Sequence, residues 1–402
     1  MPYDTSQPTD SEPSKAPSTD PSSEIGGDLG QQTVPKPPSR PWWKQAISIV
    51  VTLTVLIVVF GFVLPQLADY DAVREYISDI DFTEWIVLGL FSIWFLVAYP
   101  IVLMQVMRTL RFNEGFVNHM TGTAITNSVP SGGALALPLN YGIYMSWGFT
   151  PGVVSAGLLG AGVWDWLARL SLPVLAVIGI AIIGDAVGWM WVVSLVGITV
   201  VAVMVVTLVK VLSSEVGAAS MARFADSWGS KVLGLAKRDN PGIRAMVLQF
   251  REDLKGIIDH RMLRLSLATV GNHLAMATLF TASVYSVGVS SDQIAIPWVV
   301  LAFTLGRFLV MIPVSPGGLG LVDLGWIGLL TLGWEATSGT PADADLIAAG
   351  VLLFRALSFL PPIPVGMASW LFWRANKSWQ KPWQTVRRGA DSTVPTETAT
   401  EH

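Results

Sequence analysis

The sequence contains no cysteine, which excludes disulfides, thiol catalysis and cysteine-ligated metals. Its four histidines, His119, His260, His273 and His402, lie far apart and do not show the spacing of metal ligands. No Gly-x4-Gly-Lys-Ser/Thr run is present, so the usual phosphate-binding loop of ATP-driven proteins is missing. A membrane-embedded enzyme would need a nucleophile with its base, or a metal cluster. We therefore expect no catalytic residues and no cofactor.

Charged residues are also scarce. They make up 13% of the chain, against about 25% in soluble domains. Hydrophobic residues make up 51%, and the mean hydropathy is +0.53. This composition predicts an all-α polytopic membrane protein, with a transmembrane domain over residues 45–375. Residues 1–40 are rich in Pro, Ser, Thr and acids, and residues 389–402 are polar, so both segments are predicted to be disordered tails.

Apolar runs long enough to cross the hydrocarbon core of a bilayer, about 30 Å, predict six to eight transmembrane helices. They fall at residues 46–64, 86–107, 153–183, 189–212, 263–287, 294–312 and 345–373, with a shorter run at 319–334. Residues 120–147 are apolar but interrupted by Pro130 and Pro138 and dotted with Thr, Asn and Ser. We interpret that segment as a re-entrant helical hairpin.

The distribution of Lys and Arg predicts the orientation. The segment 65–84 is acidic, whereas 213–262 is rich in Lys and Arg, as are the entry to the first span and the end of the last. Because basic loops stay in the cytoplasm, both termini are predicted to be cytoplasmic in a plasma-membrane protein. Residues 213–262 would form a cytoplasmic insertion whose later part, 243–262, has amphipathic helical spacing. It could lie on the inner membrane surface or dock a protein partner.

Two similar Pro/Gly-rich segments interrupt the apolar runs. The first reads SVPSGGAL from Ser128, and the second reads PVSPGGLG from Pro313. Arg169 follows the first segment, and Arg355 follows the second at nearly the same distance in sequence. Pro173 and Gly179 come after Arg169, as Pro361 and Gly366 come after Arg355. With the predicted orientation, this pattern indicates an inverted repeat with two broken hairpins, typical of alternating-access transporters, although chance or simple packing kinks are alternatives.

The breaks and the intramembrane charges predict one binding site. Charged residues inside spans usually face a bundle interior or a cavity, and helices that start after a break attract anions at their N-termini. Asp165 can pair with Arg169 four residues on, and Asp323 is the expected shared partner of Arg307 and Arg355. Three arginines favour a phosphate-bearing ligand. The candidate substrate-binding residues are Arg355, Arg307, Arg169, Asp323, Asp165, Ser315, Pro316, Gly317, Gly318, Gly320, Asn127, Pro130, Ser131, Gly132 and Gly133.

His273 lies in the predicted span 263–287. A histidine in such a position either donates a hydrogen bond between helices or relays protons.

The run from Pro313 to Gly320, followed by Asp323 and Arg355, resembles the transmembrane region of lysylphosphatidylglycerol synthases and of stand-alone flippase-like membrane proteins. The resemblance covers residues 45–375. It implies movement of a lipid between leaflets. Lysine transfer is not expected, because no soluble aminoacyl-transferring domain follows Trp373. The family usually has Glu where this chain has Asp323, and its first-half motif carries a Glu and an Arg that residues 131–135 lack.

These observations together predict a flippase-like transporter that translocates an amphipathic lipid with an anionic headgroup. A phospholipid and a polyprenyl-phosphate carrier would both fit. Membrane lipids are the expected partners, and nucleic acid is not. Two alternatives are a non-transporting scaffold for a cell-envelope or lipid-modifying enzyme, docked through residues 213–262, and a membrane-embedded lipid-modifying enzyme.

Overall fold

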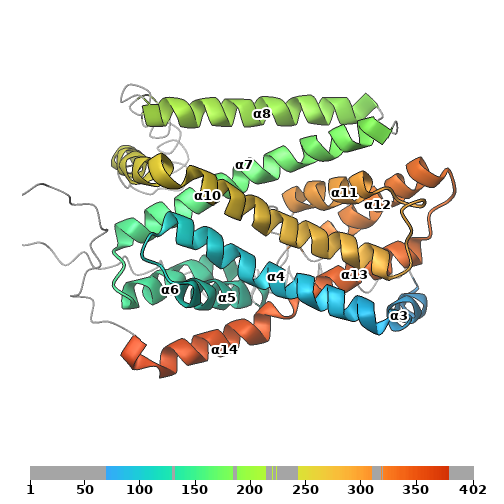
Figure 1. The fold of residues 1–402 in the computed structure, drawn as a ribbon, viewed down its shortest axis with the longest axis horizontal. Helices are drawn as coiled ribbons and strands as arrows, with labels where there is room; N and C mark the ends of the chain where they lie inside the picture. The colour runs from blue at the N-terminus through green and yellow to red at the C-terminus, as the bar shows by residue number, and fades with distance from the viewer. Residues whose placement is uncertain are drawn as a thin grey trace, which may run out of the picture. The chain divides into compact units, whose positions relative to one another are not determined.

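Helices form every secondary-structure element in the part of the chain that the computed structural model describes (Figure 1). That part comprises residues 69–128, 132–183, 188–213, 243–309 and 320–379, with Ser220, Arg223 and Gly318 as single residues. The predictions for the two tails, the span at 46–64 and most of the insertion fall outside it. The helices are α3 (Tyr70–Ser78), α4 (Phe82–Val106), α5 (Phe112–Ser128), α6 (Gly132–Ser146), α7 (Pro151–Ile183), α8 (Gly188–Ser213), α10 (Ile243–Ser286), α11 (Ile296–Leu309), α12 (Leu321–Ser338), α13 (Ala344–Phe359), α14 (Pro362–Ala375) and the 3₁₀ turn η3 (Lys377–Trp379).

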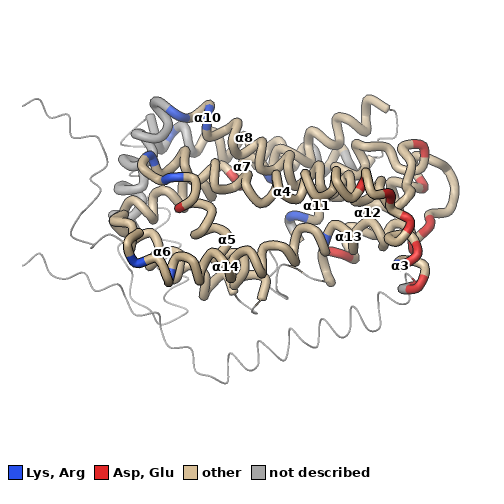
Figure 2. The backbone as a smooth tube through the Cα atoms, turned by 60° about the horizontal axis from the view of Figure 1, so that its bottom comes forward, with Lys and Arg blue, Asp and Glu red and all other residues tan. Residues whose placement is uncertain are grey.

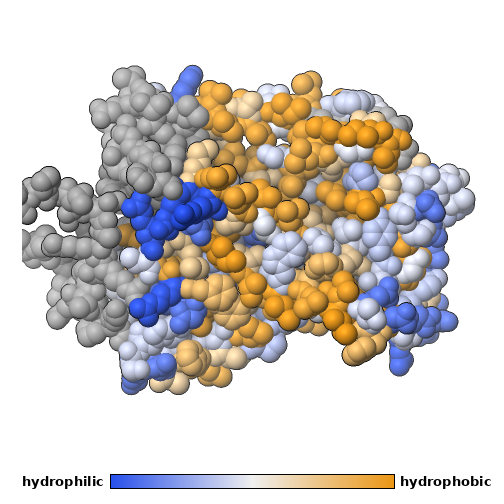
Figure 3. Space-filling view, viewed as in Figure 1, coloured by the Kyte–Doolittle hydropathy of each residue, from blue (hydrophilic) through white to orange (hydrophobic). Residues whose placement is uncertain are grey.

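Four helical stretches are long and apolar enough to cross a membrane: Phe82–Val106, Pro151–Ile183, Arg261–Ser286 and Ala344–Ala375. Large apolar side chains such as Leu90, Leu195 and Leu267 remain exposed on α4, α8 and α10. Figure 3 shows that apolar residues dominate the middle of the molecule on the face drawn, while hydrophilic residues gather at its ends. Exposure of so many large apolar side chains to water is unfavourable, and such a surface is stable in contact with lipid. The chain is therefore an all-α, membrane-embedded protein.

Charge separates along the helices. Figure 2 shows Lys and Arg gathered at the end of the bundle where α10 begins, and Asp and Glu at the opposite end, near α3. Short α3 is held at that acidic end by α13, because the Tyr76 hydroxyl donates to the Asp343 carboxylate at 3.2 Å and the Asp69 N–H donates to Asp345 at 2.6 Å. This separation fits a cytoplasmic basic end, which stays a prediction from the positive-inside rule.

Two predicted elements differ from the structure. The apolar run 345–373 is divided into α13 and α14, because Pro361 and Pro362 lack the N–H groups that would continue the helical hydrogen bonds. The segment 243–262 is not a separate surface helix, since α10 continues without interruption from Ile243 to Ser286 over 44 residues.

Two helix pairs, α5 with α6 and α11 with α12, pack as hairpins around the predicted breaks. In each hairpin a glycine of the first helix lets a side chain of the second approach closely. A Cβ atom at Gly122 would lie 2.7 Å from the Asn140 amide nitrogen, and one at Gly306 would overlap the indole of Trp326. In both halves the hairpin is followed by a helix that carries an arginine, Arg169 on α7 and Arg355 on α13.

The segments beyond these arginines each pack on the hairpin of the other half. Helix α14 contacts α5 through Gly366, where a Cβ atom would overlap the Met120 carbonyl oxygen. Helix α7 contacts α11 through Gly179, where a Cβ atom would lie 3.1 Å from Pro297. Between the two halves, α4 packs against α10, and the two helices run in opposite directions (Figure 1).

Candidate functional site

A cavity of about 470 Å³ lies among the helices, lined by residues of α4, α5, α6, α7, α10, α11, α12 and α13. Its apolar lining includes Phe95, Leu137 and Met276. Its polar lining gathers residues that are far apart in sequence. The hairpin α5–α6 contributes the largest share of these residues.

Three arginines from three helices meet at this cavity: Arg169 of α7, Arg307 of α11 and Arg355 of α13. Each lies among apolar neighbours in its helix, where exposure to lipid would cost about 2.5–3.5 kcal/mol on insertion scales. Facing a polar cavity avoids that cost. The sequence placed these three arginines in one site, and the structure brings them to one cavity, as it does Asp165.

Arg169 is held by an ion pair on its own helix. Its Nε lies 2.7 Å from Oδ2 of Asp165, one helical turn earlier. The other oxygen of Asp165 lies 3.4 Å from Nε2 of His273 on α10. The Nδ1 atom of His273 is 3.0 Å from the Thr269 carbonyl oxygen, which can only accept, so Nδ1 carries a hydrogen. With its hydrogen on Nδ1, a neutral His273 ring presents Nε2 as an acceptor and makes no hydrogen bond to Asp165, so the two roles that the sequence allowed stay predictions.

Arg355 is held by a carboxylate that is buried behind it. Its Nε donates to Oδ1 of Asp323, whose side chain is 1% exposed. The guanidinium also lies 4.7 Å from the ring centroid of Trp326, at cation–π distance. Trp326 belongs to an aromatic cluster with Phe280, Phe303 and Phe354, so the surroundings of Arg355 are tightly packed.

Asp323 also occupies the positive end of α12. Its Oδ2 accepts from the N–H of Gly320, the residue that precedes the helix, at 2.8 Å. Gly320 has φ of 89°, a conformation that favours glycine. The sequence predicted that this helix N-terminus would attract the ligand's negative charge. A carboxylate of the same chain therefore already lies at this positive end and would compete with a ligand's anion for it, so binding of the ligand there stays a prediction.

Arg307 differs from the other two arginines. It makes no hydrogen bond or ion pair within the described part of the chain, and its Nε is buried without a hydrogen-bond partner. The expectation that Asp323 would serve both Arg307 and Arg355 is therefore wrong, because Asp323 is engaged by Arg355 and the Gly320 amide. What sets Arg307 apart is the lack of an ion pair in the described part of the chain, since Nε of Arg169 is also buried without a hydrogen bond.

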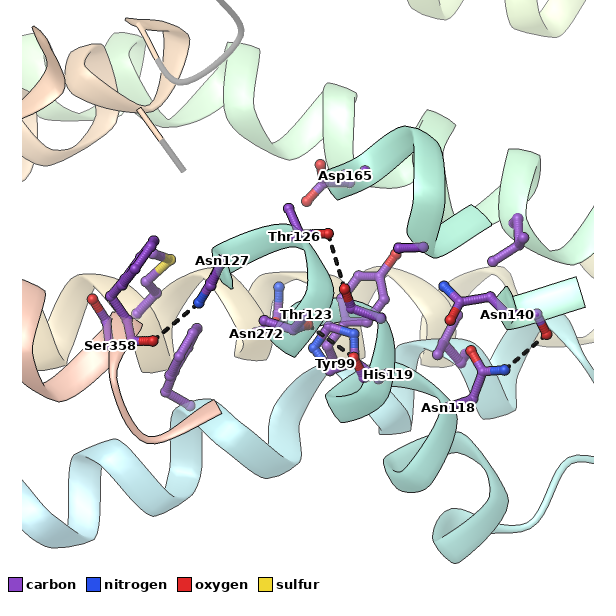
Figure 4. A pocket seen from close by; sticks show the side chains of 18 of the residues that line it. Tyr99, Asn118, His119, Thr123, Thr126, Asn127, Asn140, Asp165, Asn272 and Ser358 are labelled. Carbon is purple, nitrogen blue, oxygen red and sulfur yellow. Dashed lines mark hydrogen bonds between the residues drawn. The ribbon is translucent and has the colours of Figure 1, made fainter. Parts of the chain in front are cut away.

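A polar face of α5 was not recognised in the sequence apart from Asn127. Figure 4 shows that five side chains of this helix gather along the cavity: Asn118, His119, Thr123, Thr126 and Asn127. With Gly122 they form three neighbouring pairs, 118/119, 122/123 and 126/127, each four residues after the one before. This spacing places all six residues on one side of a helix. This spacing was the available signal. Tyr99 of α4 and Asn272 of α10 lie against the same group.

The remaining predicted residues have different positions. Asn127 and Gly133 line the cavity, and the Asn127 amide donates to the Phe359 carbonyl at 3.1 Å. Gly132 packs against the backbone of Ile125. Gly318 and Gly320, with positive φ of 74° and 89°, are not among the described lining residues. Pro130, Ser131, Ser315, Pro316 and Gly317 lie outside the described residues.

Comparison with known proteins adds no family. No protein-family model matches the chain, and no curated protein sequence matches it. The likeness to the transmembrane region of lysylphosphatidylglycerol synthases therefore stays a prediction from the motif residues. What the fold and the cavity define is a class: an all-α membrane protein with a cationic, amide-lined cavity inside an apolar bundle.

Proposed function

We propose that this protein binds the anionic headgroup of a membrane lipid in the cavity and moves the lipid between leaflets. The observation that carries the proposal is the convergence of Arg169, Arg307 and Arg355 from three helices on one cavity. Guanidinium groups match phosphate oxygens in planar pairs of hydrogen bonds, so a phosphate-bearing headgroup suits this set.

Two features that fit an internal repeat support transport over simple binding. The glycine contacts inside the two hairpins correspond, Gly122 with Asn140 and Gly306 with Trp326. The opposite directions of α4 and α10, which precede the two hairpins, fit an inverted repeat. Inverted repeats with a site between them are the usual architecture of transporters that open alternately to the two sides.

The contacts of α14 with α5 and of α7 with α11 support the same mechanism. Gly179 and Gly366 each bring the helical segment beyond an arginine onto the other half's hairpin. A relative movement of the two halves would therefore change the walls of the cavity. The resemblance to flippase-like proteins, carried by Pro313–Gly320, Asp323 and Arg355, agrees with a lipid as cargo.

The test is transport in vesicles that contain the purified protein. A fluorescent anionic phospholipid is reconstituted, and its exchange between leaflets is followed by chemical quenching from outside. We expect exchange above that of protein-free vesicles, and a strong reduction in Arg307→Gln because the variant loses a cation that would bind the headgroup. Arg307 has no ion pair in the described structure, so its replacement leaves no carboxylate without a partner, and a reduction would report lost binding.

Arg374→Gln is the matched control. Arg374 lies in the last turn of α14 with its guanidinium 5.2 Å from the Trp370 ring centroid, and it does not line the cavity. Its loss should leave exchange at the wild-type rate. Equal exchange in vesicles with and without protein would refute the proposed function. Equal rates in Arg307→Gln and wild type would show that Arg307 is not needed for transport, which contradicts the proposed role of the arginines.

A further inference from the structure

The charges around the cavity are unevenly balanced. Three arginines, Arg169, Arg307 and Arg355, stand against two carboxylates, Asp165 and Asp323, and each carboxylate is already engaged by an arginine. Before the histidines are counted, this leaves one positive charge in excess. A headgroup that carries an ammonium, such as choline or a lysyl group, would find no available carboxylate among the described lining residues. The charge set therefore accepts an anion and repels a cation.

The rest of the polar lining is uncharged. Its amides and hydroxyls come from Tyr99, Asn118, Thr123, Thr126, Asn127, Asn140, Tyr144, Asn272 and Ser358, with His119 beside them. Two of their atoms, Oδ1 of Asn140 and the hydroxyl of Tyr144, are buried and have no hydrogen-bond partner in the described structure. Tyr144 is 0% exposed. Buried polar atoms without partners cost about 1–3 kcal/mol each, so their presence at a cavity points to a ligand that supplies partners.

Hydroxyl groups are the ligand atoms that fit this lining. A hydroxyl both donates and accepts, as do the amides of Asn140 and Asn272 and the hydroxyl of Tyr144. Several such contacts around a compact ring or short chain of hydroxyls would use the polar side of α5 along its length. The side chains of Asn118, Thr123, Thr126 and Asn127 each donate to a backbone carbonyl and keep oxygen lone pairs that can accept from a ligand. A bare phosphate would use the arginines and make no use of these acceptors.

We propose that the headgroup is an uncharged sugar or polyol joined to the lipid through phosphate, with the phosphate at the arginines and the hydroxyls along α5. This assignment rests on the proposed function and specifies its cargo. It excludes zwitterionic lipids as preferred cargo.

The test is binding of four probes to the purified protein in detergent, measured as changes in intrinsic fluorescence. Phosphatidylinositol offers phosphate and hydroxyls, and phosphatidylmethanol offers the same charge without hydroxyls. Phosphatidylcholine adds a cation. Glycerophosphoinositol is the soluble headgroup without acyl chains. We expect phosphatidylinositol to bind at least about tenfold more tightly than each of the other three. Against phosphatidylmethanol this difference corresponds to one or two neutral hydrogen bonds or more. Against phosphatidylcholine it reflects the added cation, and against glycerophosphoinositol the missing acyl chains.

Two variants locate the hydroxyl contacts. Thr123→Val removes a hydroxyl that lines the cavity and bonds the carbonyl of His119, and Asn272→Leu removes a cavity amide. Each should reduce the preference for phosphatidylinositol over phosphatidylmethanol by about threefold to tenfold. Thr278→Val is the matched control, because Thr278 makes the same backbone bond, to Leu274, on the exposed side of α10. It should keep the wild-type preference.

The outcomes separate this inference from the proposed function. If phosphatidylmethanol and phosphatidylinositol bind equally tightly, the polyol assignment is overturned while an anionic-lipid site stands. If phosphatidylcholine binds as well as either, the charge argument fails. If glycerophosphoinositol binds as tightly as phosphatidylinositol, the ligand is a soluble sugar phosphate and not a lipid. If no probe binds, both the inference and the proposed function are refuted.

Discussion

The pair formed by Arg355 and Asp323 allows a structural role to be separated from a binding role. Asp323 is 1% exposed and the Arg355 side chain 11%, so neither charge is well solvated. Removing one partner of a buried pair leaves the other uncompensated and costs about 3–5 kcal/mol. Arg355→Gln should therefore lower the unfolding temperature of the purified protein as well as its activity, and a loss of function in that variant alone would be ambiguous.

The double variant Asp323→Asn with Arg355→Gln resolves the ambiguity. It removes both charges, keeps an amide oxygen that can accept from the Gly320 N–H, and should recover much of the stability that Arg355→Gln loses. If Arg355 binds phosphate, affinity for the ligand should not recover. The loss of a charge-assisted hydrogen bond, about 1.5–3 kcal/mol, corresponds to roughly tenfold to 150-fold weaker binding.

Arg355→Lys provides the intermediate case. It keeps a positive charge beside Asp323 and should remain nearly as stable as wild type, but it lacks the planar fork that grips two phosphate oxygens. Thermal unfolding, followed by size-exclusion of heated samples, gives the stability, and titration with phosphatidylinositol gives the affinity. A double variant that binds and transports like wild type would refute the reasoning, because Arg355 would then serve only to compensate Asp323.

Three further predictions concern the breaks, the repeat and the orientation. Gly318→Leu places a side chain at φ of 74°, a strained conformation, and should abolish lipid exchange while monodisperse protein is still recovered; normal exchange would reduce that break to a packing kink. Gly366→Leu should separate α14 from α5 and lower the yield of folded protein sharply, measured by size-exclusion, since the added side chain meets backbone. Because the chain has no native cysteine, single cysteines can be labelled cleanly: those at Ser78 and Ser338 should react with an impermeant reagent on intact cells, and one at Ser378 should not. Labelling at Ser378 from outside would reverse the orientation.

Helix content and the charged part of the site could be predicted from the sequence because both depend on local rules. Long apolar runs require helices in a membrane, and an intramembrane arginine requires a polar environment wherever the helix packs. Arg169, Arg307 and Arg355 could therefore be assigned to one site without knowing the fold. The pairing of Asp165 with Arg169 follows from their spacing on one helix.

The choice of partners across the bundle could not be predicted. Asp323 had two candidate arginines, and only the packing of α12 against α13 selects Arg355. The same packing lets Asp323 accept from the Gly320 N–H, so a carboxylate of the chain occupies the start of the helix. The polar side of α5 was visible as a spacing pattern, but it acquires meaning only when α4 and α10 supply Tyr99 and Asn272 opposite it.

Each of the two hairpins packs a side chain of its second helix closely on a glycine of its first helix, but the two side chains differ in chemistry. The side chain packed on Gly122 is an amide, Asn140, and the one packed on Gly306 is an indole, Trp326. The first hairpin therefore offers hydrogen bonds to the cavity, while the second offers an aromatic face that holds Arg355. If the two halves exchange positions during transport, a ligand bound to Asn140 and Arg355 would keep its headgroup on the first hairpin and its phosphate near the second. If the proposed function holds, the amide at one hairpin and the arginine at the other would favour one orientation of the headgroup over the reverse.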